Sequence, residues 1–358
     1  MDGATLISAV ILDLDGTLLN TEKASDGILR ELLARYGKVL DRKKEDKRLG
    51  MTLKESAIAI VEDYQLPITP DCFIDQILPI CQERWAHATA LPGANRLIQH
   101  LHKHKVPFAL ASNSLQKYID AKISHQPGWR EYFSVILGSD QVKSGKPSPD
   151  IFLEAASKMG VDAVHCLVIE DSLVGVKAGK AAGMKVVAVP SAQDVANQYS
   201  IADSVLHSLL EFRPEQWMLP PFEDWVDKGL PIEPFYLKGW HRKGLFYKCA
   251  DNEDSALPDQ VLGLYFGWAK IDTHEIVKIV TSIGWEHSCC TRKRKIQMHV
   301  LDGMNESRCD EQMEILLVGY IRGLSNESGI TEEDNSIARA SLDLPTFGHH
   351  AALVSARI

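Results

Sequence analysis

Short apolar runs alternate with helix-like segments over much of the first 208 residues. Each run has the length and composition that a strand buried on both faces requires. The runs lie at residues 8–12, 106–111, 134–137, 166–169 and 185–189. Apolar residues at helical spacing separate the later runs, as in 95–104, 114–123 and 174–182. Because strands and helices alternate, we predict a three-layer α/β core with a mostly parallel sheet.

The stretch between the first predicted strand and Gly93 has helical character instead. Apolar residues recur at helix-like spacing around 28–33 and 58–61, and prolines interrupt the pattern between such groups. We therefore predict a helical insertion over about residues 21–92. Two interpretations of it stay open: a packing subdomain, or a lid that excludes water from a site on the core.

The composition changes after residue 208. Prolines and tryptophans crowd the segment 209–235, which we interpret as a rigid connector. Strand-like segments then follow with few helical stretches between them. They lie at residues 262–269, 276–280, 295–301 and 314–322. We predict a first domain over 1–208 and a small antiparallel β-barrel over 236–358.

Length, composition and charge narrow the class of protein. A chain of 358 residues is long enough for two domains. No apolar run approaches the ~18 residues of a membrane span, and the first residues do not resemble a signal peptide. We therefore expect a cytoplasmic protein without a membrane partner. The net charge of −9 argues against a nucleic-acid partner, because binding a phosphate backbone needs a basic face.

A pair of carboxylates follows the first predicted strand, in the sequence Asp13-Leu14-Asp15-Gly16-Thr17. Open α/β sheets bind ligands at the carboxyl ends of their strands, so the position suits a reaction site. One carboxylate can act as nucleophile and metal ligand while the other transfers protons. The alternative is a simple polar turn, since aspartate and glycine are common in turns.

Polar residues also follow later strands. Ser112 can hold a phosphate oxygen, although taken alone it is better explained as a helix N-cap. Lys146 lies in a loop, Gly-Lys-Pro-Ser-Pro-Asp, that its prolines make rigid. Glu170 and Asp171 end another strand, and a hard cation such as Mg²⁺ takes oxygen ligands from two such strand ends. Together with the first carboxylate pair, these residues favour one shared site.

These motifs, in this order, resemble those of the haloacid dehalogenase superfamily, in the subgroup with a helical cap inserted after the first motif. The resemblance covers about residues 8–208 and implies a Rossmann-like core. It also implies phosphate-ester hydrolysis: Asp13 attacks phosphorus to form an aspartyl-phosphate, while Asp15 protonates the leaving oxygen and then deprotonates water. An acid two residues after the nucleophile fits ester hydrolysis better than dehalogenation. Phosphomutase activity stays open without further support.

The same resemblance assigns the remaining motif residues. The implied phosphate-binding residues are Ser112, Asn113 and Lys146, which neutralise the transferring group. The implied Mg²⁺ ligands are Asp13, the backbone carbonyl of Asp15 and Asp171, with Glu170 behind them as a residue that supports the metal site.

The second region is similar to the riboflavin kinase family. The matching pieces are mainly framework segments. They are residues 230–234, 263–269, 282–285, 299, 318–322 and 342–345. The order of the domains resembles that of the plant family of bifunctional riboflavin kinase/FMN phosphatases. This resemblance implies FMN as the favoured substrate of the first domain.

This sequence departs from the riboflavin kinase pattern at the positions that the family uses for catalysis. The family's glycine-rich segment, which leads to Pro-Thr-Ala-Asn, is replaced by residues 238–248. Its glutamate base, two residues before a histidine, falls on Gln297 relative to His299, and a neutral amide cannot take a proton from riboflavin. We expect an inactive kinase half. Two alternatives stay open: a bifunctional enzyme that also uses riboflavin and ATP, or a phosphatase for sugar, polyol or nucleotide phosphates with a flavin-binding or structural barrel.

Overall fold

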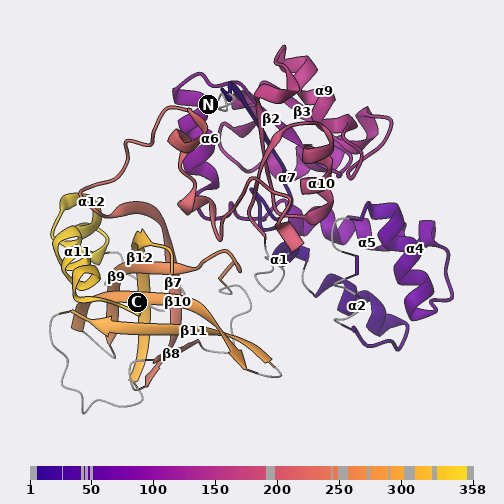
Figure 1. Ribbon diagram of the computed structural model, residues 1–358. Coiled ribbons are helices and arrows are strands. Elements are labelled where there is room, and N and C mark those ends of the chain that lie inside the picture. The colour runs from indigo at the N-terminus through magenta and orange to yellow at the C-terminus, as the bar shows by residue number, and fades with distance from the viewer. Residues whose placement is uncertain are drawn as a thin grey trace. The chain divides into compact units, whose positions relative to one another are not determined.

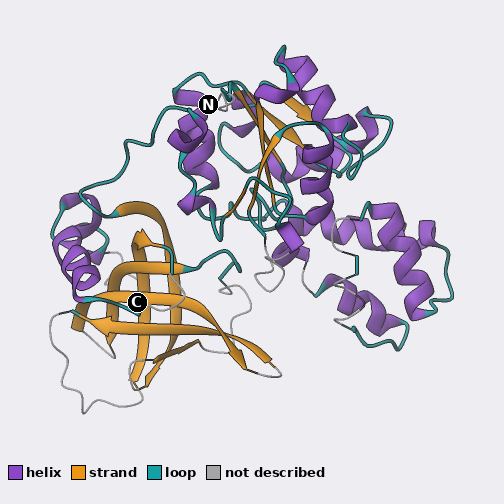
Figure 2. Cartoon of the chain, in the orientation of Figure 1, coloured by secondary structure: helices purple, strands orange, loops and turns teal. Residues whose placement is uncertain are grey.

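The structure is a computed structural model of the chain. It describes residues 6–25, 27–41, 44, 47–48, 51–190, 198–242, 245–248, 257–271, 275–288, 291–301, 311–324 and 329–352. The chain divides into two compact units, Met1–Pro221 and Phe222–Ile358. The division falls inside the segment 209–235 that we interpret as a connector. Figure 2 shows that the first unit mixes helices with strands, whereas the second is mostly strand.

The first unit contains a parallel six-stranded sheet. Its strands are β1 (Ala9–Leu12), β2 (Phe108–Ala111), β3 (Val135–Leu137), β4 (Cys166–Glu170), β5 (Lys185–Ala188) and β6 (Ser204–Val205). Their order is β3-β2-β1-β4-β5-β6, so β1 lies at the centre between β2 and β4. The predicted α/β core with a parallel sheet is confirmed.

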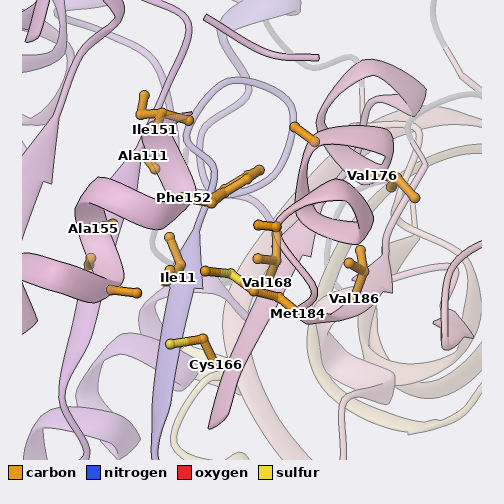
Figure 3. Packing of buried hydrophobic residues seen from close by; sticks show 14 of the residues in the cluster. Ile11, Ala111, Ile151, Phe152, Ala155, Cys166, Val168, Val176, Met184 and Val186 are labelled. Atoms are coloured by element: carbon orange, nitrogen blue, oxygen red, sulfur yellow. The ribbon is translucent and has the colours of Figure 1, made fainter. Parts of the chain in front are cut away.

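Helices follow the strands of this sheet. They are α6 (Ala94–Lys103), α7 (Gln116–Ile123), α8 (Trp129–Tyr132), α9 (Asp150–Met159) and α10 (Leu173–Ala181). Side chains of α9 and α10, such as Phe152 and Val176, pack in one cluster with Ile11 of β1 and Val168 of β4 (Figure 3). Residues of β1 outside this cluster are also fully buried, as a central strand covered on both faces requires.

The predicted helical insertion after β1 is also present. It consists of α1 (Thr21–Ser25), α2 (Ile28–Arg35), α4 (Leu53–Tyr64) and α5 (Pro70–Trp85). Helices α2, α4 and α5 share a core of their own, to which α2 gives Leu32 and α5 gives Phe73. Figure 1 shows α2, α4 and α5 grouped together. The segments that enter and leave this cap are joined by a bridge between Leu19 and Ala90.

The second unit is a closed antiparallel barrel. Its strands are β7 (Leu230–Arg242), β8 (Leu245–Lys248), β9 (Gly263–Ile271), β10 (Glu275–Ser288), β11 (Thr291–Val300) and β12 (Glu311–Arg322), in the order β10-β11-β8-β7-β12-β9. Two helices follow, α11 (Glu332–Leu342) and α12 (Pro345–Gly348). Leu342 and Phe347 pack with barrel residues such as Phe266. The predicted barrel is confirmed.

Over the described ranges, no helix combines the length and the apolar character needed to cross a bilayer.

Candidate active site

The first carboxylate lies at the carboxyl end of the central strand. Leu12 pairs with Leu110 of β2 and with Ile169 of β4, and the Asp13 N–H donates to the Ile169 carbonyl at 3.0 Å. The chain then turns at Gly16, whose φ of 82° is accessible mainly to glycine. The strand pairing therefore brings the ends of β1, β2 and β4 to one edge of the sheet, where the site is formed.

Lys146 is buried at this edge between acidic groups. Its Nζ donates to Asp13 Oδ1 at 2.6 Å, to Glu170 Oε1 at 2.7 Å and to the Ala111 carbonyl at 2.8 Å. The side chains of Lys146, Asp13 and Glu170 are all less than a tenth exposed. The ammonium thus has all of its donors used, and it fixes two carboxylates from different strands.

These contacts set the charges of the pair. Burial raises the pKa of Asp13 to about 7, with Lys146 opposing the rise and with Glu170 and Asp15 adding to it. Burial alone would lower the pKa of Lys146, but the carboxylates of Asp13 and Glu170 raise it above its ordinary value. The two carboxylates therefore favour the charged form of Lys146, and this charge opposes the rise in the pKa of Asp13.

Asn113 holds the loop that carries Lys146. Its side-chain Oδ1 accepts from the Lys146 N–H at 2.8 Å, and its Nδ2 donates to the Lys146 carbonyl at 3.2 Å. The side chain that we expected beside phosphate is thus bound to the loop backbone. This contact positions the lysine, and a phosphate contact by Asn113 stays a prediction.

Asp15 lies in a second polar cluster. Its Oδ2 accepts from the hydroxyls of Ser112 at 3.1 Å and Ser114 at 2.9 Å, and its Oδ1 accepts from Lys122 Nζ at 2.6 Å. Burial alone would raise the pKa of Asp15, but the Lys122 ammonium and hydrogen bonds from Lys122, Thr21 and Ser114 hold it below its usual value. The structure therefore brings Asp15 and Ser112 together and binds Asp15 as a carboxylate.

The acidic group at the sheet edge fits a hard divalent cation. Asp13, Glu170 and Asp171 each offer a carboxylate oxygen, and these oxygens lie within 4.8 Å of one another. Asp171 accepts from the Thr17 hydroxyl at 3.2 Å, and the Tyr199 hydroxyl donates to its backbone carbonyl at 2.7 Å. Oxygen donors from β1 and β4 thus meet as the predicted metal site requires.

Both carboxylate oxygens of Glu170 accept hydrogen bonds from other residues of the chain. Its Oε2 accepts from the N–H and the hydroxyl of Ser172 at 2.8 and 2.9 Å, while its Oε1 binds Lys146. Gly175 makes room for this carboxylate, because a Cβ there would lie 1.7 Å from Oε1. A place for Glu170 behind the metal ligands stays a prediction.

Comparison with known proteins matches the two parts of the chain to two protein families. The family model for haloacid dehalogenase-like hydrolase matches residues 10–189, and the riboflavin kinase model matches residues 247–338. The chain belongs to the haloacid dehalogenase-like hydrolase family. The bifunctional riboflavin kinase/FMN phosphatase of Arabidopsis thaliana is 44% identical over 359 residues, which covers 96% of this chain and 95% of that protein. The chain is thus a haloacid dehalogenase-type phosphatase joined to a riboflavin kinase-like domain.

Other relatives match the first unit. The (DL)-glycerol-3-phosphatase 2 of Arabidopsis thaliana is 38% identical and covers 62% of this chain and 95% of its own length. A haloacid dehalogenase family hydrolase from Deinococcus radiodurans, solved with bound phosphate and sodium, is 28% identical with a TM-score of 0.51, covering 61% of this chain and all of that one. The phosphate-bound structure of CbbY from Rhodobacter sphaeroides is also 28% identical, with a TM-score of 0.50 over 57% of this chain and 96% of its own.

Sequence reasoning missed Lys122 in this haloacid dehalogenase-like site. The residue lies on α7 and is buried with Tyr118, Ile119 and Ile123. A lysine on the apolar face of a helix is the pattern that could have identified it, because a buried ammonium needs a partner. The partner, Asp15, is 107 residues away in the sequence.

In the riboflavin kinase-like unit, the sequence departs from the family pattern at Gln297 and in the segment 238–248. Gln297 pairs with Ser282 of β10 and Leu245 of β8, and the Ser282 hydroxyl lies 3.5 Å from Gln297 Oε1. The segment 238–248, which replaces the glycine-rich segment, forms the paired strands β7 and β8, with residues 243–244 outside the described ranges. The described part of this segment is therefore a hairpin.

Proposed function

We propose that this protein hydrolyses FMN to riboflavin and phosphate, with Mg²⁺ as its cofactor and with Asp13 as the nucleophile. The observation that carries the proposal is the buried contact of Lys146 with Asp13 and Glu170, beside an Asp15 that is held separately. Similarity to the bifunctional Arabidopsis protein over nearly the whole chain supports FMN as the substrate.

The chemistry requires two displacements at phosphorus. An oxygen of Asp13 forms a bond to phosphorus while the ester bond to the ribityl oxygen breaks, and Asp15 supplies the proton that this leaving oxygen takes. Asp15 then accepts a proton from water as the water attacks the aspartyl-phosphate, which releases phosphate and restores Asp13. The lowered pKa of Asp15 favours the ionised form that accepts a proton from water in the second step, so Asp15 must take up a proton from solvent before it can protonate the leaving oxygen in the first.

Two further side chains are expected to stabilise the phosphoryl group, one by charge and one by a hydroxyl. Lys146 offers a fixed ammonium next to the attacking oxygen, and Ser112 offers a hydroxyl close to Asp15. A Mg²⁺ ion held by Asp13, the Asp15 carbonyl and Asp171 would supply additional positive charge for the phosphoryl oxygens.

A second candidate substrate is a small polyol phosphate. The relative named (DL)-glycerol-3-phosphatase 2 matches the first unit at 38% identity, and the same motifs would serve sugar and nucleotide phosphates. FMN is preferred because the attached unit matches the riboflavin kinase family, a link that a glycerol phosphatase would not need.

The kinase-like unit is proposed to transfer no phosphoryl group. Gln297 offers an amide where the family has a carboxylate base, and the β7–β8 hairpin occupies the place of the phosphate-binding segment. The alternative, a bifunctional enzyme that also uses riboflavin and ATP, is favoured by the family match over residues 247–338.

The test is phosphate release from a panel containing FMN, sugar phosphates and glycerol 3-phosphate, with MgCl₂ or with EDTA. A parallel assay supplies riboflavin and ATP and measures new FMN. We expect FMN to give the highest kcat/KM, EDTA to abolish turnover, and the kinase assay to give nothing above background. A preference for sugar or glycerol phosphate would overturn the substrate, and FMN synthesis would overturn the inactive kinase.

A further inference from the structure

We propose that Lys122 is a positioning residue for the proton-transferring carboxylate Asp15, and that Trp85 of the cap holds Lys122 in place. The inference rests on the proposed phosphatase chemistry and extends it to two residues outside the sequence motifs. One residue comes from helix α7 of the core and the other from the last position of cap helix α5.

The Lys122 ammonium forms a buried ion pair with Asp15. Its side chain is only 4% exposed, and its Nζ donates to Asp15 Oδ1 at 2.6 Å and to Ser114 Oγ at 2.9 Å. Ser114 itself donates to the other oxygen of Asp15. A buried ammonium without such partners would be strongly unfavourable, so the lysine and the carboxylate fix each other.

The two carboxylate oxygens of Asp15 have different hydrogen-bond partners. Lys122 binds Oδ1, whereas Ser112, the predicted phosphate ligand, binds Oδ2. The Asp15 side chain is 30% exposed although Lys122 behind it is almost fully buried. Lys122 therefore anchors the carboxylate through Oδ1, while Oδ2, which also accepts from Ser114, lies beside the predicted phosphate ligand Ser112.

Trp85 covers the remaining side of the ammonium. The Lys122 Nζ lies 4.3 Å from the centre of the Trp85 ring, a distance at which the ring face attracts a cation. The ring is fixed by a 2.9 Å hydrogen bond from its Nε1 to Ser25 Oγ and by an edge contact with Tyr118, one turn before Lys122 on α7. A residue of the cap thus completes the surroundings of a core residue that binds Asp15.

Two substrates with different leaving groups distinguish a residue that positions the acid Asp15 from a residue that only stabilises the fold. Breaking the phosphate ester of FMN expels an alkoxide, which needs a proton from Asp15, whereas p-nitrophenyl phosphate expels a stable phenolate that needs little protonation. The value of kcat/KM reports the steps up to formation of the aspartyl-phosphate. It therefore isolates proton transfer to the leaving group from the later attack of water.

The variants are Lys122→Met and Lys122→Arg, with Trp85→Leu and Trp85→Phe as a second pair. We expect Lys122→Met to lower kcat/KM for FMN by about 10- to 100-fold, since a general acid contributes about 10²- to 10⁴-fold, and to change kcat/KM for p-nitrophenyl phosphate by less than about threefold. Lys122→Arg should recover part of the loss. Trp85→Leu should show the same selectivity with a smaller loss, and Trp85→Phe should retain most activity.

Lys117→Met is the matched control, because Lys117 lies on the same helix and is exposed. It should leave both substrates unaffected. Equal losses on the two substrates for Lys122→Met and for Trp85→Leu would overturn the positioning role, as would an unchanged kcat/KM for FMN in Lys122→Met. Thermal unfolding of each variant shows whether a loss of activity comes from misfolding. If Lys122→Met or Trp85→Leu unfolds the protein, the same comparison of substrates is made with Lys122→Arg and Trp85→Phe.

The two proposals fail in distinguishable ways. If wild-type protein hydrolyses glycerol 3-phosphate but not FMN, the substrate assignment is wrong, and glycerol 3-phosphate replaces FMN as the alkyl ester in the same comparison. If Asp13→Asn retains turnover of both esters, the phosphatase chemistry itself is wrong.

Discussion

The two units differ in how they treat the polar residues that their families use for chemistry. In the first unit, Lys146 joins Asp13 and Glu170 in a buried cluster with contacts of 2.6 and 2.7 Å. In the second, the Ser282 hydroxyl donates to Gln297 Oε1 at 3.5 Å. Charged groups are costly to bury, so a folded chain retains such a cluster when each member supports the others. In the first unit, the residues at the motif positions therefore form a buried cluster of mutually supporting charges.

The largest expected effect is that of Asp13→Asn. Removing the nucleophile should lower FMN hydrolysis by about 10⁴-fold or more, since the groups of a catalytic unit act together. The side chain keeps its size, and Lys146 keeps Glu170 and the Ala111 carbonyl as partners, so the protein should still fold. Phosphate release and a thermal melt check both parts. Retained turnover would contradict the assignment of Asp13.

Lys146→Met should have a large effect on stability as well as on turnover. It leaves two buried carboxylates without their cation, and breaking a buried pair in this way costs about 3–5 kcal/mol in the free energy of unfolding. Urea unfolding measures the loss. Lys158→Met is the control, because the pair of Lys158 with Glu154 is exposed and such pairs contribute at most about 1 kcal/mol. Equal effects of the two variants would show that the buried cluster is not special.

Gln297→Glu applies the same comparison to the barrel. It introduces a carboxylate where the riboflavin kinase pattern has one, while residues 238–248, which we expect to replace the family's glycine-rich segment, stay unchanged. We therefore expect no FMN synthesis from riboflavin and ATP in either the wild-type protein or the variant. Synthesis by the variant alone would show that the lost base is the only defect.

A smaller effect on stability is expected from the ion pair of Asp334 with Arg322 in the second unit. Burial alone would raise the pKa of Asp334, but hydrogen bonds from Arg322 and Thr331 lower it below its ordinary value of 3.8. The folded state then binds this proton less readily than the unfolded state, so the stability that Asp334 gives is present above about pH 4 and is lost as the pH falls through the lowered pKa.

The corresponding variant is Asp334→Asn. At pH 7 it should lower the free energy of unfolding by about 1–3 kcal/mol, as expected for loss of a charged hydrogen-bonding group. The difference from the wild-type protein should shrink below pH 4, as measured by urea unfolding at a series of pH values. A difference that is constant with pH would show that the Asp334 charge is not involved.

Sequence patterns predicted the arrangement of the site where strand order decides it. Asp13, Ser112 and Asp171 each follow a short apolar run, and parallel strands bring such ends together whatever their separation in the chain. Lys122 was missed because its place on the apolar face of α7 indicates burial but does not name its partner, Asp15, which is 107 residues away in the sequence.

The extent of β7 was also not predicted. Pro231 and Pro234 favoured a connector, yet both lie within β7, Leu230–Arg242. The pairing explains how the strand tolerates them: β8 pairs only with Gly239–Arg242, at the far end of β7, so over the described residues the prolines face a single partner strand, β12. A missing N–H is tolerated where one side of a strand is not paired.

The most direct measurement is to trap the enzyme during turnover of FMN with Mg²⁺, reduce the acyl phosphate with borohydride and map the modified residue by mass spectrometry. Borohydride converts an aspartyl-phosphate to homoserine, so we expect homoserine at position 13, dependent on FMN and absent from Asp13→Asn. Turnover of FMN without modification at this position, or with modification at another residue, would show that Asp13 is not the nucleophile.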